Sequence, residues 1–525
     1  MSGFHRCAAL VLALVTLAGG AFGTFGQAQA GSGTFVALLE YEPITLDPSI
    51  AYDVAAWNIF TQVYEGLVKP LPGTTDVGPG LALSWSTSVD GLTWTFNLRH
   101  GVVFHDGTPL TASAVKFSFE RLLSINQGPA WMFSAISAVN VVNEFTVQIV
   151  LSYPYAPFLA ALSQPMAAMI VSPGILSHET AGDQAQGWIY DHDAGTGPYK
   201  LDRWLHGQEL VLVQFDGYWK GWQGDHFDSI IYRLVPEHAS QQLLLEQGVA
   251  HASNTRDGLP LESLTQLGQS GKVVIYSTAG ENVDMIGLNA SRGPCANPLV
   301  RQAISYAMDR AGVATSLYFG HATQAAGPVP PTFWGFDGSA HVYRYDLIKA
   351  RQLLIQAGYA SGLTLQAITD ENALRQREMQ ALASALDEIG VKVNIVTMTW
   401  PTEYEKLTNL DTAPDLYSFT WYSDYADPDD VIFPLYHSSQ KGSAGFNLGW
   451  YGNGTVDQML DKARSETDRA LRVKDYAQIQ KLIIEDAAAI WVVNPDTVFA
   501  VSAKIGGFIY TPFWSYNVYD MFLQK

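Results

Sequence analysis

A short run of aspartates offers candidates for acid and base chemistry. Asp427, Asp429 and Asp430 lie close together in the chain, and pairs of carboxylates hydrolyse glycosidic bonds in many enzymes. The same Asp-Pro-Asp-Asp pattern is typical of turns. The chain has no G-x-S-x-G, H-E-x-x-H or P-loop motif and no paired Cys and His. We therefore interpret these aspartates as turn residues and predict a protein that is not an enzyme, with a secreted carboxylate-dependent hydrolase as the alternative.

The histidines and cysteines do not form a metal-binding pattern. Metal ligands normally recur at short spacing, whereas the nearest histidine pair is His100 and His105, and His437 is isolated. Gly195-Thr196-Gly197 lacks the third glycine of a dinucleotide-binding fingerprint. We expect no metal site and no cofactor.

Hydrophobic periodicity predicts a mixed α/β chain that would position these residues. Strands are predicted at residues 34–40, 92–99 and 391–396, with more in the aromatic and β-branched stretch 195–235. Helices are predicted at residues 55–67, from 112 onward, 298–310, 346–357, 375–389, 456–465 and 470–489. A helix followed by Gly390 and a strand is an α/β unit.

The first thirty residues have the features of a secretory signal peptide. Arg6 precedes an apolar run over residues 7–18 and the small-residue sequence Ala28-Gln29-Ala30. The run is shorter than the roughly 20 apolar residues that span a bilayer. We expect cleavage after Ala30, and because Gly31 follows instead of cysteine we expect no lipid anchor. The sequence predicts an exported, soluble protein of the periplasm.

Composition favours a large globular protein. About 495 residues follow the signal peptide, which at roughly 100–200 residues per domain gives two to four domains. Apolar residues make up 48% and charged residues 15% of the chain, a balance that argues against disorder. The formal net charge of −20 repels phosphate backbones, so nucleic acid is excluded as a partner.

Seven segments in series carry a recognisable pattern, and they lie at residues 64–67, 94–112, 195–199, 218–221, 298–304, 345–359 and 422–428. Together they resemble the dipeptide- and oligopeptide-binding proteins of ATP-driven importers, the bacterial extracellular solute-binding protein family 5. The resemblance implies an α/β fold of the periplasmic-binding-protein type (type II, cluster C), a two-lobed clamp with an extra subdomain in the first lobe. It divides the chain into lobe I (31–70, 195–278 and 490–525), a second subdomain of lobe I (71–194) and lobe II (279–489).

The same resemblance implies which residues bind the ligand. In the family a carboxylate in the segment matched by residues 421–425 pairs with the ammonium group of a peptide, which makes Asp424 the expected anchor. A buried ammonium group without a counter-charge costs several kcal/mol. Strand-like edges bind the peptide main chain, and the matching edges are Tyr52, Asp53 and Val54 on one lobe and Trp421, Tyr422 and Ser423 on the other. Asp53 is equally a candidate N-cap for the helix that follows it.

Two further sets of residues complete the expected site. Arg375 and Arg377 match the start of a family helix that binds the ligand carboxylate, so either arginine can serve, and a solvated helix face is the alternative. The aromatic residues Trp400, Trp421, Tyr422, Tyr425 and Trp450 are candidates for a wall that holds peptide side chains or sugars, or for ordinary core.

The implied function is that of the substrate-binding component of an ABC importer. It captures a dipeptide or oligopeptide between its lobes and delivers it to the permease subunits in the membrane, acting as a monomer. Within the family, an oligosaccharide, an opine, a nickel chelate or haem is the alternative ligand.

Overall fold

The computed structural model describes residues 33–524 except 165–166, 255–258, 340–342, 512 and 514. Residues 1–30, the predicted signal peptide, lie outside the described residues. None of the helices in the described ranges has the length and apolar character needed to cross a bilayer.

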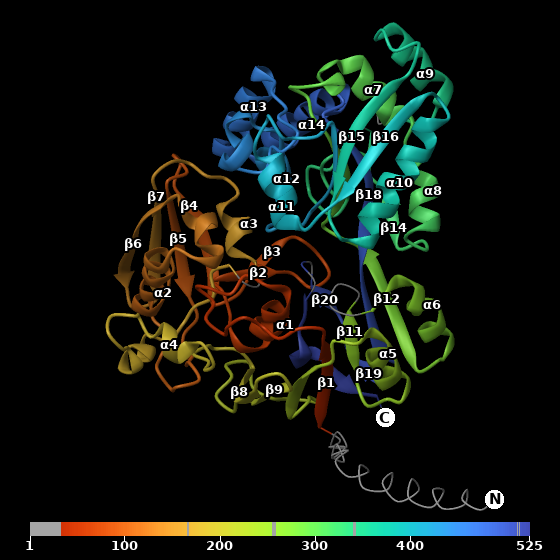
Figure 1. Ribbon diagram of the computed structural model, residues 1–525. Helices are drawn as coiled ribbons and strands as arrows, with labels where there is room; N and C mark the ends of the chain where they lie inside the picture. The colour runs from red at the N-terminus through yellow and green to blue at the C-terminus, as the bar shows by residue number, and fades with distance from the viewer. Residues whose placement is uncertain are drawn as a thin grey trace, which may run out of the picture.

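One large mixed sheet runs through the molecule and links its lower and upper lobes (Figure 1). Lobe I is built on β1 (Thr34–Leu39), β8 (Tyr199–Leu205), β9 (Glu209–Gln214), β10 (Ser229–Leu234), β11 (Ala252–Asn254) and β12 (Val273–Ala279). Lobe II is built on β13 (Val283–Leu288), β14 (Ala322–Gln324), β15 (Leu363–Thr369), β16 (Val391–Thr397) and β17 (Leu416–Trp421). The strand order is β16-β15-β17-β13-β18-β11-β1-β10-β9-β8.

Strand β18 (Ala489–Ser502) belongs to both lobes. Its first half pairs with β13 and β14 of lobe II, and its second half pairs with β11 and β12 of lobe I. Twelve of its fourteen residues are buried, as expected for a strand covered on both faces. The two lobes are therefore continuous through the backbone of one strand.

Helices pack around the sheet of lobe II, and some of them lie on the side of this lobe that faces lobe I (Figure 1). They are α7 (Pro298–Tyr306), α8 (Arg310–Ser316), α9 (Leu347–Gln356), α10 (Ala373–Asp387), α11 (Trp400–Leu407), α12 (Pro428–Tyr436), α13 (Gly454–Ser465) and α14 (Arg469–Glu485). In α10, Met379, Leu382 and Leu386 recur at helical spacing and are buried. Side-chain caps fix the helix starts, as where Asp346 accepts a hydrogen bond from the N–H of Lys349.

Three hydrophobic clusters contain residues of lobe I, and the first of them continues into lobe II. The first includes α1 (Val54–Val63), which packs against β8, while α5 (His238–Glu246) and α6 (Leu261–Gln269) flank the other side of the sheet. The second core lies in a separate body made of α2 (Ala112–Ile125), α3 (Phe158–Leu162) and the sheet β4 (Ala82–Thr87), β5 (Thr93–Leu98), β7 (Thr146–Leu151) and β6 (Ile136–Asn143). In β5, Trp94, Phe96 and Leu98 are buried in alternation, which confirms the predicted strand.

Small elements complete the fold. They are α4 (Gln186–Ile189) and the two-stranded pairs β2 (Val68–Pro70) with β3 (Val77–Pro79), β19 (Ile505–Gly506) with β22 (Phe522–Leu523), and β20 (Tyr510–Thr511) with β21 (Ser515–Tyr516).

Three predicted helices extend too far. The helix predicted at 298–310 ends at Tyr306, and α8 begins separately at Arg310; the other two are α1 and α14. Helix α1 ends at Val63 because Tyr64 adopts an extended conformation, and Gly66 then forms a bridge to Met169. Helix α14 ends at Glu485, and Ala487 has a positive φ of 48° just before β18 begins at Ala489. The end of α1 is thus followed by a bridge to a distant segment, whereas α14 ends in local hydrogen bonds from the N–H groups of Ala487 and Ala488 to the carbonyls of Ile484 and Ile483.

An ion pair joins the two bodies of lobe I. The Nη1 and Nη2 atoms of Arg121, on α2, lie 2.7 and 2.6 Å from the two carboxylate oxygens of Asp47. Both side chains are almost fully buried. Buried pairs of this kind depend on both partners, because removal of one leaves an uncompensated charge.

Asp47→Asn is expected to lower the free energy of unfolding by about 3–5 kcal/mol, because Arg121 would remain buried without its counter-charge. Asp202→Asn is the control, since it removes an exposed pair with Arg203 at 2.9 Å and should cost less than about 1 kcal/mol. Urea denaturation followed by tryptophan fluorescence measures both. Equal effects of the two substitutions would contradict the role assigned to Asp47.

Candidate ligand-binding cleft

A cavity of about 930 Å³ lies between the lobes, within the size range of small-molecule sites. From lobe I it is lined by Tyr41, Ile50, Tyr52, Asp53, Val54, Trp57, Gly128 and Trp131. From lobe II it is lined by Asp370, Arg375, Trp400, Ser418, Phe419, Thr420, Trp421, Tyr422, Asp424 and Phe446. A ligand in this cavity contacts both lobes at once.

The predicted anchor, Asp424, lies at the point where the two lobes meet in the cleft. The hydroxyl group of Tyr52, from lobe I, donates a hydrogen bond to the Oδ1 atom of Asp424 in lobe II. Burial raises the pKa of Tyr52 well above its usual value, and the Asp424 carboxylate adds to this shift. The tyrosine therefore stays neutral and acts as a donor to the carboxylate.

Asp430 holds Asp424 and Trp421 in place from behind the cavity wall. Its Oδ2 atom accepts hydrogen bonds from the backbone N–H of Asp424 and from the indole N–H of Trp421, both at 3.1 Å. Asp430 is 1% exposed, and burial, followed by the neighbouring Asp424 carboxylate, raises its pKa. The position of the anchor is thus set by a buried carboxyl group that does not line the cavity.

Asp53 serves as the N-cap of α1 and also lines the cavity. Its Oδ1 atom accepts a hydrogen bond from the N–H of Ala56 at 2.9 Å, and its Oδ2 atom accepts one from the N–H of Ile44 at 3.4 Å. Burial raises the pKa of Asp53. Asp53 therefore caps the helix, as the alternative predicted. Its neighbours Tyr52 and Val54 line the same side of the cleft.

The two candidate arginines lie in different surroundings. Arg375 lines the cleft, where its Nε atom lies 2.9 Å from Asp370 Oδ1 and its Nη1 atom donates to Thr420 Oγ1 at 2.8 Å. Arg377 lines a neighbouring cavity of about 410 Å³ and lies 3.5 Å from Glu262 of lobe I. Side chains two positions apart on a helix point in nearly opposite directions. Of the two arginines, only Arg375 borders the main cavity.

Ser423 and Tyr425 do not line the cleft either, although they flank Asp424. The hydroxyl of Ser423 donates to the backbone carbonyl of Glu281 at 2.6 Å. Tyr425 is buried in the second core of lobe I, where its hydroxyl lies 2.9 Å from that of Tyr155. These two side chains fasten the segment around Asp424 to its surroundings.

Aromatic rings cover much of the cavity wall. Phe419 stacks on Trp400 with ring centroids 5.5 Å apart, and Phe446 lies edge-on to Trp421, also at 5.5 Å. The sequence analysis did not single out the lining residues Tyr41, Trp57, Trp131, Phe419 and Phe446. Alternation along β17 relates Phe419 to Trp421, but nothing in the local sequence relates Trp57 and Trp131 to the cleft.

The three clustered aspartates of α12 are engaged in structural contacts. Both carboxylate oxygens of Asp427 bind Arg472 at 2.7 Å, and Asp429 lies 3.2 Å from Arg464. With Asp430 beneath Asp424, all three are at most 2% exposed. None lines the cleft, so this cluster does not supply the carboxylate pair that the hydrolase alternative assigned to it.

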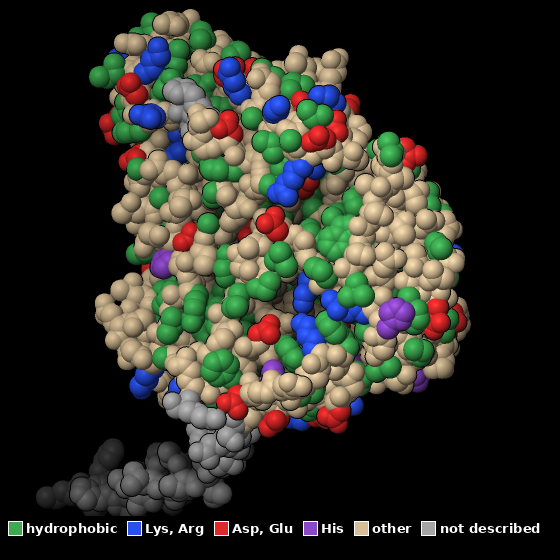
Figure 2. All heavy atoms as spheres, turned by 180° about the vertical axis from the view of Figure 1, so that it is seen from behind, with side chains coloured by type: hydrophobic (Ala, Val, Ile, Leu, Met, Phe, Trp, Pro, Cys, Tyr) green, Lys and Arg blue, Asp and Glu red, His purple; other side chains and the backbone are tan. Residues whose placement is uncertain are grey.

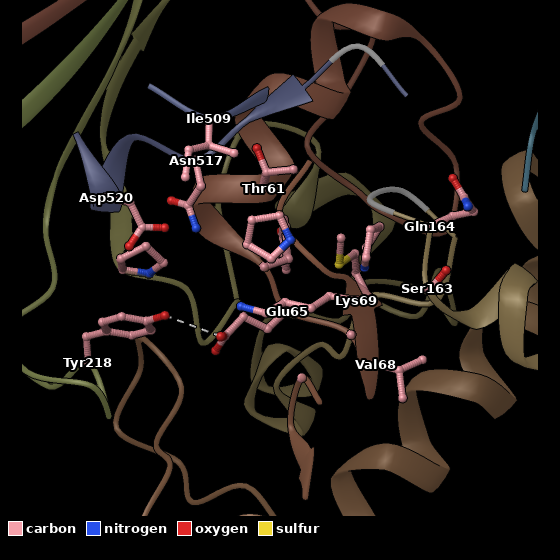
Figure 3. Close-up of a pocket in the computed structure, with 17 residues that line it drawn as sticks. Thr61, Glu65, Val68, Lys69, Ser163, Gln164, Tyr218, Ile509, Asn517 and Asp520 are labelled. Carbon is pink, nitrogen blue, oxygen red and sulfur yellow. Dashed lines mark hydrogen bonds between the residues drawn. The ribbon is translucent and has the colours of Figure 1, made fainter. Parts of the chain in front are cut away.

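A second, smaller cavity lies within lobe I, and three of the recognisable segments contribute to its wall through residues 64–66, Pro198 and Tyr218 (Figure 3). In its wall, Glu65 accepts a hydrogen bond from Tyr218 at 3.4 Å (Figure 3). Glu65 also accepts hydrogen bonds from Trp219 at 2.9 Å and from Thr196 at 3.0 Å. Three of the segments that carry the resemblance thus meet at one carboxylate, away from the interlobe cleft.

Within the described ranges, no group of three or more His, Cys, Asp or Glu side chains has a metal-binding arrangement. His105 instead lies 2.5 Å from Asp193, and His437 hydrogen-bonds Ser439 at 2.7 Å.

The fold and the cleft define a two-lobed solute receptor whose ligand is enclosed between lobes. The chain belongs to the bacterial extracellular solute-binding proteins, family 5, whose middle-region model matches residues 76–443. This match confirms the resemblance seen in the sequence.

Relatives and solved structures agree with this assignment. The probable D,D-dipeptide-binding periplasmic protein DdpA of Escherichia coli (strain K12) is 34% identical over 90% of each chain. Heme-binding protein A of Haemophilus influenzae is 30% identical over 96% of each. The structure of HbpA2 from Haemophilus parasuis superposes with a TM-score of 0.83 at 26% identity, covering 94% of this chain and all of the other. DppA from Helicobacter pylori, in complex with the peptide STSA, gives a TM-score of 0.76 at 26% identity, with 94% and 98% covered. The two-lobed α/β fold is thereby confirmed.

The buried carboxyl group of Glu403, on α11 near the cleft, gives a testable pH dependence. Burial, with a smaller contribution from Asp370, raises its pKa to about 8, and neither oxygen has a hydrogen-bond partner among the described residues. Between about pH 5 and pH 8 the folded chain keeps a proton that the unfolded chain releases. The free energy of unfolding therefore falls as the pH rises, by about 1.4 kcal/mol per unit from this group.

Glu403→Gln is expected to remove this contribution, so its melting temperature relative to the wild type should rise between pH 5 and pH 8. Differential scanning calorimetry at several pH values measures the difference. Glu405→Gln, at an exposed position on the same helix, is the control. Parallel pH profiles for the Glu403 variant and the wild type would refute the raised pKa.

Proposed function

We propose that this protein captures a dipeptide or oligopeptide between its lobes and delivers it to the permease of an ABC importer. The observation that carries the proposal is the pairing of Tyr52 and Asp424 across a cavity of about 930 Å³. Those two residues come from opposite lobes: Asp424 is the residue expected to bind the amino end of a peptide, and Tyr52 belongs to an edge expected to bind its main chain. Relatives that share the family are named for binding a D,D-dipeptide and glutathione, and DppA was solved with a peptide.

The amino end of the peptide is bound by Asp424 in this proposal. An ammonium group enclosed in the cleft loses its water and needs a counter-charge. Asp424 supplies it, while the Tyr52 hydroxyl, which already donates to Asp424, orients the carboxylate. The main chain of the peptide then runs between the edges formed by residues 52–54 and 421–422.

The other end of the ligand meets Arg375. Its guanidinium already pairs with Asp370, so a ligand carboxylate shares the arginine with an existing partner. The site therefore suits a peptide whose carboxylate lies at the periphery of the cavity. It suits less well a ligand whose carboxylate needs an arginine of its own. The aromatic wall takes the apolar side chains.

Ligand binding shifts the lobes toward the closed state. A ligand changes such an equilibrium only by its difference in affinity for the two states, and contacts on both walls provide that difference. Strand β18 connects the lobes. The proposed domain boundaries are 31–70, 195–278 and 490–525 for lobe I, 71–194 for its second subdomain, and 279–489 for lobe II. The closed monomer is the form that the permease subunits recognise.

Export follows from the proposed signal peptide. Cleavage after Ala30 releases a soluble periplasmic protein without a lipid anchor.

On the face shown in Figure 2, acidic and basic side chains are interspersed rather than gathered into a basic surface. With a formal net charge of −20, this surface does not suit nucleic acid. The protein acts as a binding component and has no catalytic role of its own.

Asp424→Asn is expected to weaken peptide binding by roughly 2–5 kcal/mol, because the ammonium group would be buried without a counter-charge. Native mass spectrometry of freshly purified protein identifies the bound peptide, and isothermal titration calorimetry with that peptide measures the loss. A bound haem or sugar in place of a peptide would overturn the proposed ligand class.

Two controls accompany this measurement. The first control is Asp387→Asn, at an exposed position at the end of α10. This substitution should leave the affinity for the peptide unchanged. The N-acetylated peptide, which has no ammonium group, should bind the wild type and Asp424→Asn equally. An unchanged affinity of Asp424→Asn for the free peptide would remove Asp424 from the site.

A further inference from the structure

A separate cavity of about 390 Å³ lies at another part of the boundary between the lobes. Lobe I contributes the turn between β2 and β3, at residues 73–76, and lobe II contributes Thr332, Trp334 and Arg469. The hydroxyl of Thr75 donates to the backbone carbonyl of Thr332 at 3.0 Å and joins the two walls. The cavity shares no lining residue with the main cleft.

The unusual group in this wall is the carboxyl group of Glu281. Glu281 is 1% exposed, and its Oε2 atom accepts one long hydrogen bond, from the N–H of Phe513 at 3.4 Å. Its Oε1 atom has no hydrogen-bond partner within the described residues. An unsatisfied buried carboxylate is costly unless a donor or cation meets it. Glu281 lies in the short connection between β12 and β13, and no motif of the sequence marked it.

The opposite side of the cavity carries a loosely held cation. The Nη2 atom of Arg469 lies 3.7 Å from the Oδ1 atom of Asp76, beyond hydrogen-bond distance. The guanidinium group lies 5.0 Å from the ring centroid of Trp334, and its side chain is 60% exposed. An aromatic face and a hydroxyl, from Trp334 and Tyr510, complete the wall.

We propose that this cavity is a second binding site for a small molecule with an ammonium group, which Glu281 binds as the counter-charge. An ammonium group has three donors and no acceptor, so it satisfies the unpaired Oε1 atom, and the Trp334 ring favours a neighbouring cation. A simple amine and a free amino acid share this chemistry. An amino acid would in addition place its carboxylate toward Arg469.

Occupancy of this site stabilises the closed arrangement of the lobes, because its walls come from both. The link to the main cleft is short: Ser423, next to Asp424, donates to the backbone carbonyl of Glu281 at 2.6 Å. Two ligands that both prefer the closed state increase each other's affinity. The second site does not depend on the proposal that the main cleft binds a peptide.

The test is calorimetry with ethylammonium chloride, L-alanine and sodium acetate on the Asp424→Asn variant, whose main cleft lacks its anchor. We expect saturable binding of ethylammonium and alanine and none of acetate. Adding Glu281→Gln should weaken both ligands at least tenfold, whereas adding Asp387→Asn should change neither. Absence of saturable ethylammonium binding, or binding that Glu281→Gln leaves unchanged, would overturn the proposal.

Two further measurements sharpen the result. Tighter binding of alanine than of ethylammonium, lost in Arg469→Gln, identifies an amino acid as the ligand, and equal binding identifies a simple amine. Burial raises the pKa of Glu281 to about 7, so ethylammonium affinity of the Asp424→Asn protein should increase about tenfold per pH unit up to about 7 and then level off. Asp76, Arg469 and Tyr510 are the other ionisable side chains of the wall. A flat pH profile would contradict the role of Glu281 without requiring a variant of it.

Discussion

The two lobes share the backbone of a single strand, and this continuity constrains every other feature of the molecule. Hydrogen bonds of β18 hold β13 at one end and β11 and β12 at the other. Relative motion of the lobes has to be absorbed along this strand and the nearby connections. The two walls of the cleft are therefore connected through β18, a strand that is almost entirely buried.

The segments by which the family is recognised stabilise the architecture more than they form the cleft. Glu65, Thr196 and Trp219 come from three of these segments and meet in a hydrogen-bonded group within lobe I. Similarity in such segments preserves the fold among relatives whose named ligands include a D,D-dipeptide and haem. The walls that face the ligand come largely from other positions, among them Trp57, Trp131 and Phe446.

Around Asp424 the chain alternates between the cleft and the interior. Asp424 and Tyr422 line the cavity, whereas Ser423 and Tyr425 bond to Glu281 and Tyr155. Asp430 then binds the backbone of Asp424 from below. Of the aspartates that resembled an acid and base pair in the sequence, Asp430 therefore holds the segment around Asp424, whereas Asp427 and Asp429 pair with arginines. Burial makes all three poor candidates for contact with a substrate.

The sequence by itself determined the features that depend on near neighbours. Alternation gave the strand at Trp94 and Phe96, hydrophobic periodicity gave the helices α2 and α9, and the seven segments gave the family and the two-lobed fold. Tertiary structure alone decided which of Arg375 and Arg377 borders the cleft, that the chain after α1 bridges to Met169, and that Tyr425 packs into the other lobe. The reason is physical: burial and pairing at these positions depend on atoms supplied from hundreds of residues away, such as Tyr155 for Tyr425, and no local pattern encodes those partners.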